Sequence, residues 1–192
     1  AVQFSSGRLV EGKTYRSLVN PGIPIPAIST SVHKISDEDV QNAPLFKSAW
    51  PALSDYMGGS VVIGHSIGYD LAILSNEMQR AGIPFARPRT LDVRLLAQIV
   101  QPDLASYSLE SLAVWLGVES SARHSALGDA LTAGRIFVAL VPKLREGNIR
   151  TLAEAEAACS RLTTALEEQH RAGWAEPVLA MSRSDTERVL AR

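Results

Sequence analysis

The sequence has little cysteine, few aromatic residues and almost no net charge, and each shortage excludes a class of protein. The one cysteine, Cys159, allows no internal disulfide and no thiolate metal cluster, which fits a reducing cytoplasm. A net charge of −1 argues against a broad, positively charged surface that binds duplex nucleic acid. It leaves open a small site where metal ions supply the positive charge. No apolar run approaches membrane length and no signal peptide is visible, so we expect a cytoplasmic protein without membrane contact.

The 192 residues are 46% hydrophobic, which is enough to bury the core of one α/β domain and an appendage. Prolines at 21, 24 and 26 predict an irregular crossing segment. The hydrophobic pattern predicts, in chain order, a hairpin over 1–19, a short helix after Ser36, a helix over 45–57, a strand over 60–63, a helix over 70–81, a strand over 89–93, and helices over 94–100, 108–116 and 126–144. This order predicts an α/β fold with a mixed sheet flanked by helices.

The C-terminal residues differ in character, and we expect a helical extension over 147–192 after a domain over 1–146. A capping box at Thr151–Glu154 predicts one helix that Gly173 ends. Its apolar seam consists of Leu152, Ala155, Cys159, Leu162 and Leu166. Because two heptads make only a short coiled coil, packing on the protein's own domain is favoured over a partner-binding face.

The segment from Ser60 to Leu74 combines a buried strand with the start of a helix. The run Val61–Ile63 is β-branched without alternation, which is typical of a central parallel strand. Asp70 follows it in the first turn of the predicted helix. Open α/β sheets bind their ligands at such a carboxyl edge, so Asp70 is a candidate site residue.

Two histidine–aspartate pairs have the same spacing: His65 with Asp70, and His124 with Asp129. In each pair the carboxylate lies in a first helical turn and the histidine just before it. Two aspartates in one cleft repel each other unless cations lie between them, and oxygen ligands favour Mg²⁺ or Mn²⁺. Two such ions about 3.5–4 Å apart activate water for phosphodiester hydrolysis, and a histidine accepts the proton. Spacing alone does not separate these aspartates from structural ones.

The residues around both pairs resemble a known family. Gly64–Leu74 is similar to the second motif of the DnaQ-like, DEDDh-type 3′–5′ exonucleases, which include the epsilon proofreading subunit of bacterial DNA polymerase III. Arg123–Ala130 is similar to their third motif, a histidine, four residues, an aspartate and an alanine. Further matches in family order are Leu18–Pro21 with Ile25 and Pro26, Val32–Ser36 with Val40, Leu91 and Asp92, and Ser108–Ala113.

The resemblance implies a ribonuclease H-like fold and a two-metal site binding Mg²⁺ or Mn²⁺. It makes Asp70 and Asp129 metal ligands, His124 the general base and His65 a supporting residue beside the ligands. The implied substrate is a single-stranded or frayed 3′ end, DNA rather than RNA, from which nucleoside 5′-monophosphates are released. A polymerase is an implied protein partner. Two further matches, Asp92 and His33, are expected to have structural roles.

One family motif is not found: the Asp-x-Glu that supplies two further carboxylates from the first, central strand. The hairpin at Ala1 resembles the family's segment immediately after that motif, so we expect the strand and its acidic pair upstream in the parent protein. Removing a central strand would leave its neighbours unpaired and expose the core. If the chain truly lacks the motif, two carboxylates are a poor cage for paired metals, and little activity is expected.

Two other interpretations stay open. Gly64–Gly68 satisfies the Gly-x-Ser-x-Gly elbow of α/β-hydrolases, with Ser66 as nucleophile and Asp92 or Asp103 followed by His124 in the required order. Against it, Tyr69 follows where small residues are usual, no His-Gly-Gly loop precedes, and the second His-x4-Asp is left unexplained. The other interpretation is a nuclease fold kept as a binding or assembly module that docks through its C-terminal helix.

Overall fold

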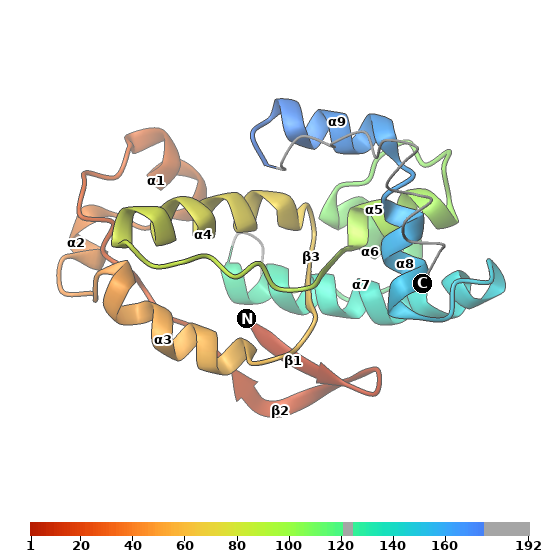
Figure 1. Ribbon diagram of the computed structural model, residues 1–192, viewed down its shortest axis with the longest axis horizontal. Coiled ribbons are helices and arrows are strands. Elements are labelled where there is room, and N and C mark those ends of the chain that lie inside the picture. Colours follow the sequence, from red (N-terminus) through yellow and green to blue (C-terminus); the bar gives the residue numbers. More distant parts are fainter. Residues whose placement is uncertain (121–124, 175–192) are drawn as a thin grey trace, which may run out of the picture.

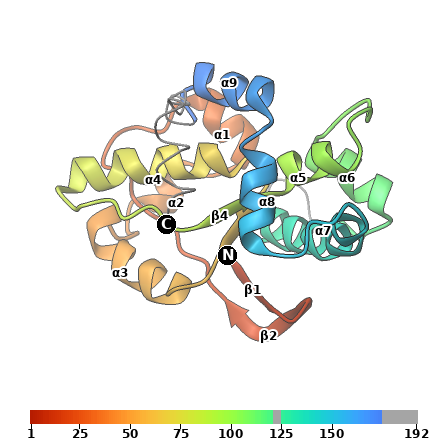
Figure 2. The same ribbon diagram turned by 45° about the vertical axis from the view of Figure 1, so that its right-hand side comes forward.

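The computed structural model of the protein describes residues 1–120 and 125–174, and its strands form two separate pairs. β1 (Val2–Ser5) and β2 (Arg8–Thr14) form an antiparallel hairpin. β3 (Val62–Gly64) and β4 (Thr90–Asp92) lie parallel. The hairpin occupies the lower edge of the molecule in both ribbon views, with most helices above it (Figures 1 and 2). This mixed α/β arrangement agrees with the predicted fold class.

The hairpin turn is tighter than the sequence pattern indicated. Ser6 and Gly7 both have positive φ, 50° and 76°, as a two-residue turn with the twist of the flanking strands requires. Such a short turn starts the second strand at Arg8. The second strand therefore ends at Thr14, and residues 15–19 of the predicted hairpin lie outside it.

Helices α1 (Ala27–His33), α2 (Asp37–Val40) and α3 (Phe46–Met57) follow the hairpin. α1 was not predicted, since the three preceding prolines indicated irregular chain; it begins directly after the last of them. A capping box of Ser36 and Asp39 opens α2. Pro51 lies inside α3, and Gly58, at φ 50°, ends it.

The predicted strand over 60–63 and the predicted helix over 70–81 are both present, as β3 (Val62–Gly64) and α4 (Ile67–Ala81). β3 is paired in register with β4, so that Gly64 lies opposite Asp92 at the carboxyl edge. α4 (Ile67–Ala81) begins three residues later and ends at Gly82, whose φ of 67° suits glycine. The parallel register brings the ends of both strands, and the residues after them, to one edge.

The core lies among α5 (Val93–Val100), α6 (Leu109–Leu116) and α7 (Ala126–Glu146). α7 packs against α5, α6, β1 and β3, so one long helix joins both strand pairs. Fully buried side chains from these three helices interlock at the centre: Val93, Leu96, Leu112, Ile136 and Leu140. The predicted helices over 94–100, 108–116 and 126–144 are therefore present with small changes at their ends.

The extension forms two helices, α8 (Leu152–Cys159) and α9 (Thr163–Arg171), where one was expected. The predicted capping box at Thr151 and Glu154 is present. α8 packs on α5, and Ala155 belongs to the central core. The boundary at 146 stays a prediction. None of the described helices has the length and apolarity to cross a membrane.

Candidate functional site

The turn from β3 into α4 carries His65, Ser66 and Asp70. Ser66 has left-handed backbone angles, φ 55° and ψ 42°, directly before the first helical residue. A non-glycine residue in this region is uncommon and costs on the order of 1–3 kcal/mol unless its surroundings fix it. The Ser66 N–H donates to Asp92 Oδ1 at 2.9 Å. A side chain at the end of the neighbouring strand therefore holds this turn.

Asp92 is buried, with 5% of its surface exposed, and both of its carboxylate oxygens accept hydrogen bonds. Oδ1 accepts from the backbone N–H groups of Ser66 and Arg94, each at 2.9 Å. Oδ2 accepts from Gln169 Nε2 at 3.1 Å. A buried carboxylate with this many donors is satisfied in place, as expected for a residue that organises its neighbours.

His65 is fixed from the other side of the same turn. Its Nε2 lies 2.7 Å from the carbonyl oxygen of Tyr107. Since a carbonyl only accepts, Nε2 is the donor in this hydrogen bond, which fixes the orientation of the ring. His65 also contributes a favourable charge interaction to Asp70. The supporting role predicted for His65 stays a prediction.

Asp129 lies in the first turn of α7. The turn is capped by Ser125, whose hydroxyl accepts from the Gly128 N–H at 3.0 Å, and the Asp129 N–H donates to the Ser125 carbonyl. Asp129 and Asp70 both line one cavity of about 1340 Å³, together with His65. The fold thus brings two carboxylates from distant parts of the chain to the same space. His124 lies outside the described residues.

The walls of this cavity are mainly apolar and come from both strand pairs. They include Val2 and Phe4 from β1, Val62 and Ile63 from β3, and Phe137 from α7. Within the described residues β1 pairs with β2 alone and β3 with β4 alone. The cavity is therefore bordered by two strands that each have one partner.

The environment of Asp70 disfavours its charged form. Burial among the cavity walls raises the pKa of the Asp70 carboxyl, and the nearby negative charge of Asp92 raises it further. Asp70 is nevertheless classed as exposed over the whole residue, and it is one of the residues that line the cavity. A nearby cation would stabilise the ionised Asp70 carboxylate, because it offsets both the desolvation and the negative charge of Asp92.

The donor chemistry of Asp70 and Asp129 fits Mg²⁺ or Mn²⁺, which prefer carboxylate oxygen. Across residues 1–120 and 125–174, no three acidic, histidine or cysteine side chains gather closely enough to hold a metal ion. The two aspartates therefore fit as part of a ligand set and need further donors to complete it.

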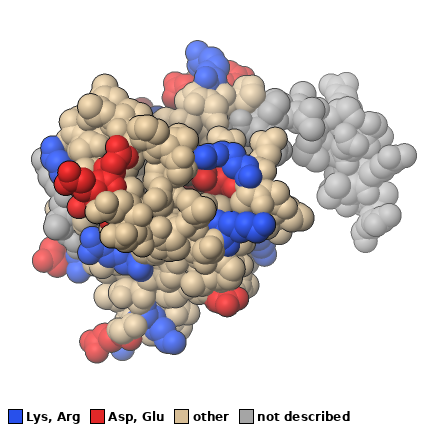
Figure 3. Space-filling view, turned by 90° about the vertical axis from the view of Figure 1, so that its left-hand side faces the viewer, with Lys and Arg blue, Asp and Glu red and all other residues tan. Residues whose placement is uncertain are grey.

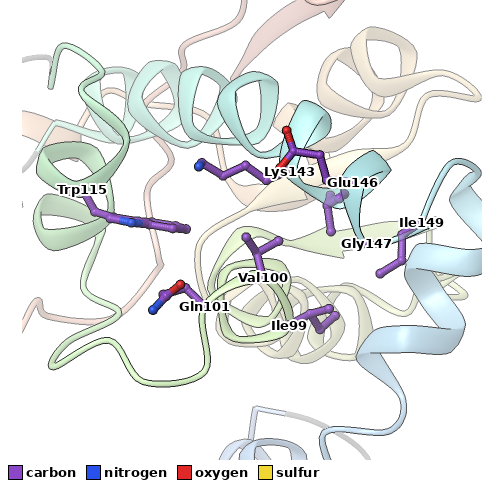
Figure 4. A pocket seen from close by; sticks show the side chains of 9 residues that line it. Ile99, Val100, Gln101, Trp115, Lys143, Glu146, Gly147 and Ile149 are labelled. Carbon is purple, nitrogen blue, oxygen red and sulfur yellow. The ribbon is translucent and has the colours of Figure 1, made fainter.

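A second, smaller cavity of about 450 Å³ lies at the other end of α7 (Figure 4). Its walls include Ile99 and Val100 of α5, and the Lys143 ammonium lies 5.6 Å from the centre of the Trp115 ring. Glu146 supplies the one carboxylate among its lining residues. This cavity offers no acidic pair, so the larger one is the candidate site.

Sequence reasoning did not identify Gln169. Its amide meets Asp92 across 77 positions of sequence. The sequence around this glutamine is mostly polar and contains no pattern that predicts its burial. Its neighbours Glu167 and Glu168 are charged.

The fold defines a class: α/β domains of the ribonuclease H-like architecture. The solved structure of Exonuclease X in complex with 5′ overhanging duplex DNA is similar, with a TM-score of 0.60 over 82% of this chain and 87% of that one. At 18% sequence identity this likeness shows the fold alone. It confirms the predicted ribonuclease H-like architecture.

The chain belongs to the RNase_T exonuclease family, whose model matches residues 1–137. It is 35% identical over 153 residues to a DNA polymerase III subunit epsilon-like protein of Rhodobacter capsulatus, covering 79% of this chain and 22% of that protein. It is 29% identical over 146 residues to the 3′-5′ exonuclease DinG of Bacillus subtilis, covering 76% and 16%. The chain thus spans less than a quarter of these relatives. The resemblance found in the sequence is confirmed.

Family membership also decides against the α/β-hydrolase interpretation of Ser66. That mechanism needs an acid to orient a histidine beside the serine hydroxyl. Here the Asp92 carboxylate is occupied by the backbone N–H groups of Ser66 and Arg94 and by the Gln169 amide, whereas the histidine of that interpretation, His124, lies outside the described residues. Ser66 is therefore a turn residue at the start of α4.

Proposed function

We propose that this protein is a metal-dependent 3′–5′ exonuclease that hydrolyses phosphodiester bonds at DNA 3′ ends and releases nucleoside 5′-monophosphates. The observation that carries the proposal is the convergence of Asp70 and Asp129 on one cavity within a chain of the exonuclease family. The names of the relatives, an epsilon-like polymerase subunit and a 3′-5′ exonuclease, support the direction of attack and the DNA substrate.

Asp70 and Asp129 would hold the divalent cations, which supply an activated water and neutralise charge on the phosphate. His124, which directly precedes the α7 cap residue Ser125 in the sequence, accepts the proton of the attacking water. His65 is held in one orientation by the Tyr107 carbonyl and supports the turn that carries Asp70. The attack is by water, so neither Ser66 nor Cys159 is required.

The remaining metal ligands are proposed to come from an extended segment inserted between β1 and β3. Both strands border the cavity, and the apolar walls suit a strand that is buried on both faces. An Asp-x-Glu on such a strand would bring two carboxylates toward Asp70 and Asp129. Four carboxylates make a better cage for two cations than two do.

The surface favours a single-stranded or frayed end over a long duplex. On the face that carries α1 and α2, Lys and Arg lie among Asp and Glu without a field of one sign (Figure 3). With an aromatic content of 6%, the chain offers little for a broad stacking platform. Substrate binding would then depend on the metal site and a narrow cleft. We propose a cytoplasmic setting with a polymerase as partner.

The proposal is tested by replacing His124 with alanine and, separately, Asp129 with asparagine in the intact protein. With Mg²⁺ or Mn²⁺ and a 5′-labelled single strand, His124→Ala should lower turnover by about 10²–10⁴-fold. Asp129→Asn should weaken Mn²⁺ binding measured by calorimetry. The matched control is Asp103→Asn, an exposed carboxylate outside the cavity, which should change neither quantity. Wild-type turnover by His124→Ala, or wild-type Mn²⁺ binding by Asp129→Asn, would contradict the assigned roles.

A further inference from the structure

We propose that Gln169 is a positioning residue that acts through Asp92 to fix the turn carrying His65 and Asp70. Its effect on catalysis rests on the proposed nuclease function, whereas its effect on the turn does not. Gln169 lies in α9, beyond residue 137, where the match to the exonuclease family model ends. The C-terminal extension would then contribute to the site.

The hydrogen bond from Gln169 fixes the orientation of the Asp92 carboxylate. Gln169 is buried, with 5% of its surface exposed, and donates from Nε2 to Asp92 Oδ2 at 3.1 Å. The other oxygen of the same carboxylate accepts from the Ser66 N–H. Rotation of the Asp92 carboxylate would break both bonds, so the glutamine amide sets the orientation in which Asp92 holds Ser66. This matters because Ser66 has a left-handed backbone that needs external restraint.

The end of α9 also closes directly on the first turn of α4. A β-carbon on Gly68 would come within 2.8 Å of the Trp174 carbonyl oxygen and 3.3 Å of Gln169 Oε1, so only glycine permits this approach. The rings of Tyr69 and Trp174 meet edge to face, with centres 5.6 Å apart. In both ribbon views α9 lies above the beginning of α4 (Figures 1 and 2).

The chemistry of an amide suits this position better than that of a charged or apolar side chain. A glutamine amide can donate to Asp92 without adding charge near Asp70, whereas lysine or arginine would add a competing cation. A glutamate at 169 would place two carboxylates against each other in a buried position. A leucine would leave Oδ2 without its donor.

The test combines Gln169→Leu and Gln169→Glu with Glu168→Gln as the matched control. Glu168 is adjacent, exposed and forms a 3.7 Å ion pair with Arg94. Amide exchange followed by NMR should show the Ser66 N–H exchanging at least about tenfold faster in both Gln169 variants, with core amides of α7 unchanged. Turnover with Mn²⁺ should fall about 10- to 100-fold, the usual effect of losing a residue that orients a ligand. Glu168→Gln should match wild type in both measurements.

A reciprocal exchange keeps the test decisive if a single variant folds poorly. In Asp92→Asn/Gln169→Glu the amide introduced at position 92 donates to the carboxylate introduced at position 169, and the amide oxygen still accepts from Ser66. This double variant should recover Ser66 protection and most of the turnover that Gln169→Glu loses. If wild type shows no nuclease activity, the proposed function fails, yet the exchange data still decide the role of Gln169. Unchanged Ser66 exchange in Gln169→Leu, or no recovery in the double variant, overturns the inference.

Discussion

Gly134 lies in the middle of α7 against the ring of Phe4, the contact through which the hairpin packs on this helix. A β-carbon at 134 would come within 2.7 Å of Phe4 Cζ and 2.9 Å of Cδ2, and closer still to Cε2. Carbon atoms prefer about 3.5–4.0 Å, so the Phe4 ring must shift out of its present position. Overpacking of this kind costs about 1–3 kcal/mol, while glycine to alanine in a helix gains about 1 kcal/mol. We expect Gly134→Ala to lower the free energy of unfolding by up to about 2 kcal/mol.

The same substitution should have the opposite sign when the ring is absent. In a Phe4→Ala background the new methyl group meets no aromatic atoms, so only the helix preference remains and alanine should stabilise by about 0.5–1 kcal/mol. Urea unfolding followed by circular dichroism at about 222 nm measures both differences. Gly147→Ala, at an ordinary φ of −80° and with its nearest contact at 3.4 Å, serves as the control. Equal stabilisation by Gly134→Ala in both backgrounds would refute the packing argument.

Three further predictions concern single side chains. The pKa of Asp70 is raised in the folded protein, so ionisation of Asp70 lowers the free energy of unfolding of the metal-free protein above that pKa. This loss of stability disappears below the ordinary pKa of 3.8. Asp70→Asn in EDTA should therefore raise the melting temperature at about pH 7 and leave it unchanged near pH 3. Burial raises the pKa of Cys159 to about 12, so only about one thiol in ten thousand is ionised at about pH 8, and reaction with Ellman's reagent should be slow until urea unfolds the protein. Ser66→Gly relieves a left-handed backbone and should keep turnover within about twofold, whereas a serine nucleophile would lose it.

The hydrophobic pattern predicted the helices that have a clear apolar stripe, but it missed helices whose formation depends on the surrounding structure. α1 follows Pro26, has no acidic residue in its first turn, and contains Ile28 and Val32, which are exposed. It has no buried stripe to reveal it. In the extension the apolar spacing continues from Cys159 to Leu162 through the break between α8 and α9. The spacing of apolar residues predicts which face of a helix is buried, but it does not predict whether the backbone between two turns stays helical.

For the candidate site, Asp70 and Asp129 were predicted from the two histidine–aspartate pairs together with the family resemblance, and their metal-binding role stays a prediction. Their convergence on one cavity depends on how α7 packs against β3, which no local pattern encodes. Gln169 was missed for the same reason. Its partner lies on a strand whose position relative to α9 is fixed by tertiary packing alone.

The hydrogen bond between Gln169 and Asp92 also affects the order in which parts of the chain become ordered during translation. Ribosomes add about 5–20 residues per second, so the N-terminal residues of a chain are available seconds before the C-terminal ones. Asp70 is therefore made well before α9, the helix that holds Asp92 and, through it, the turn before Asp70. On this proposal, a nascent chain would complete the turn that carries His65 and Asp70 only after α9 has emerged, late in the translation of this region.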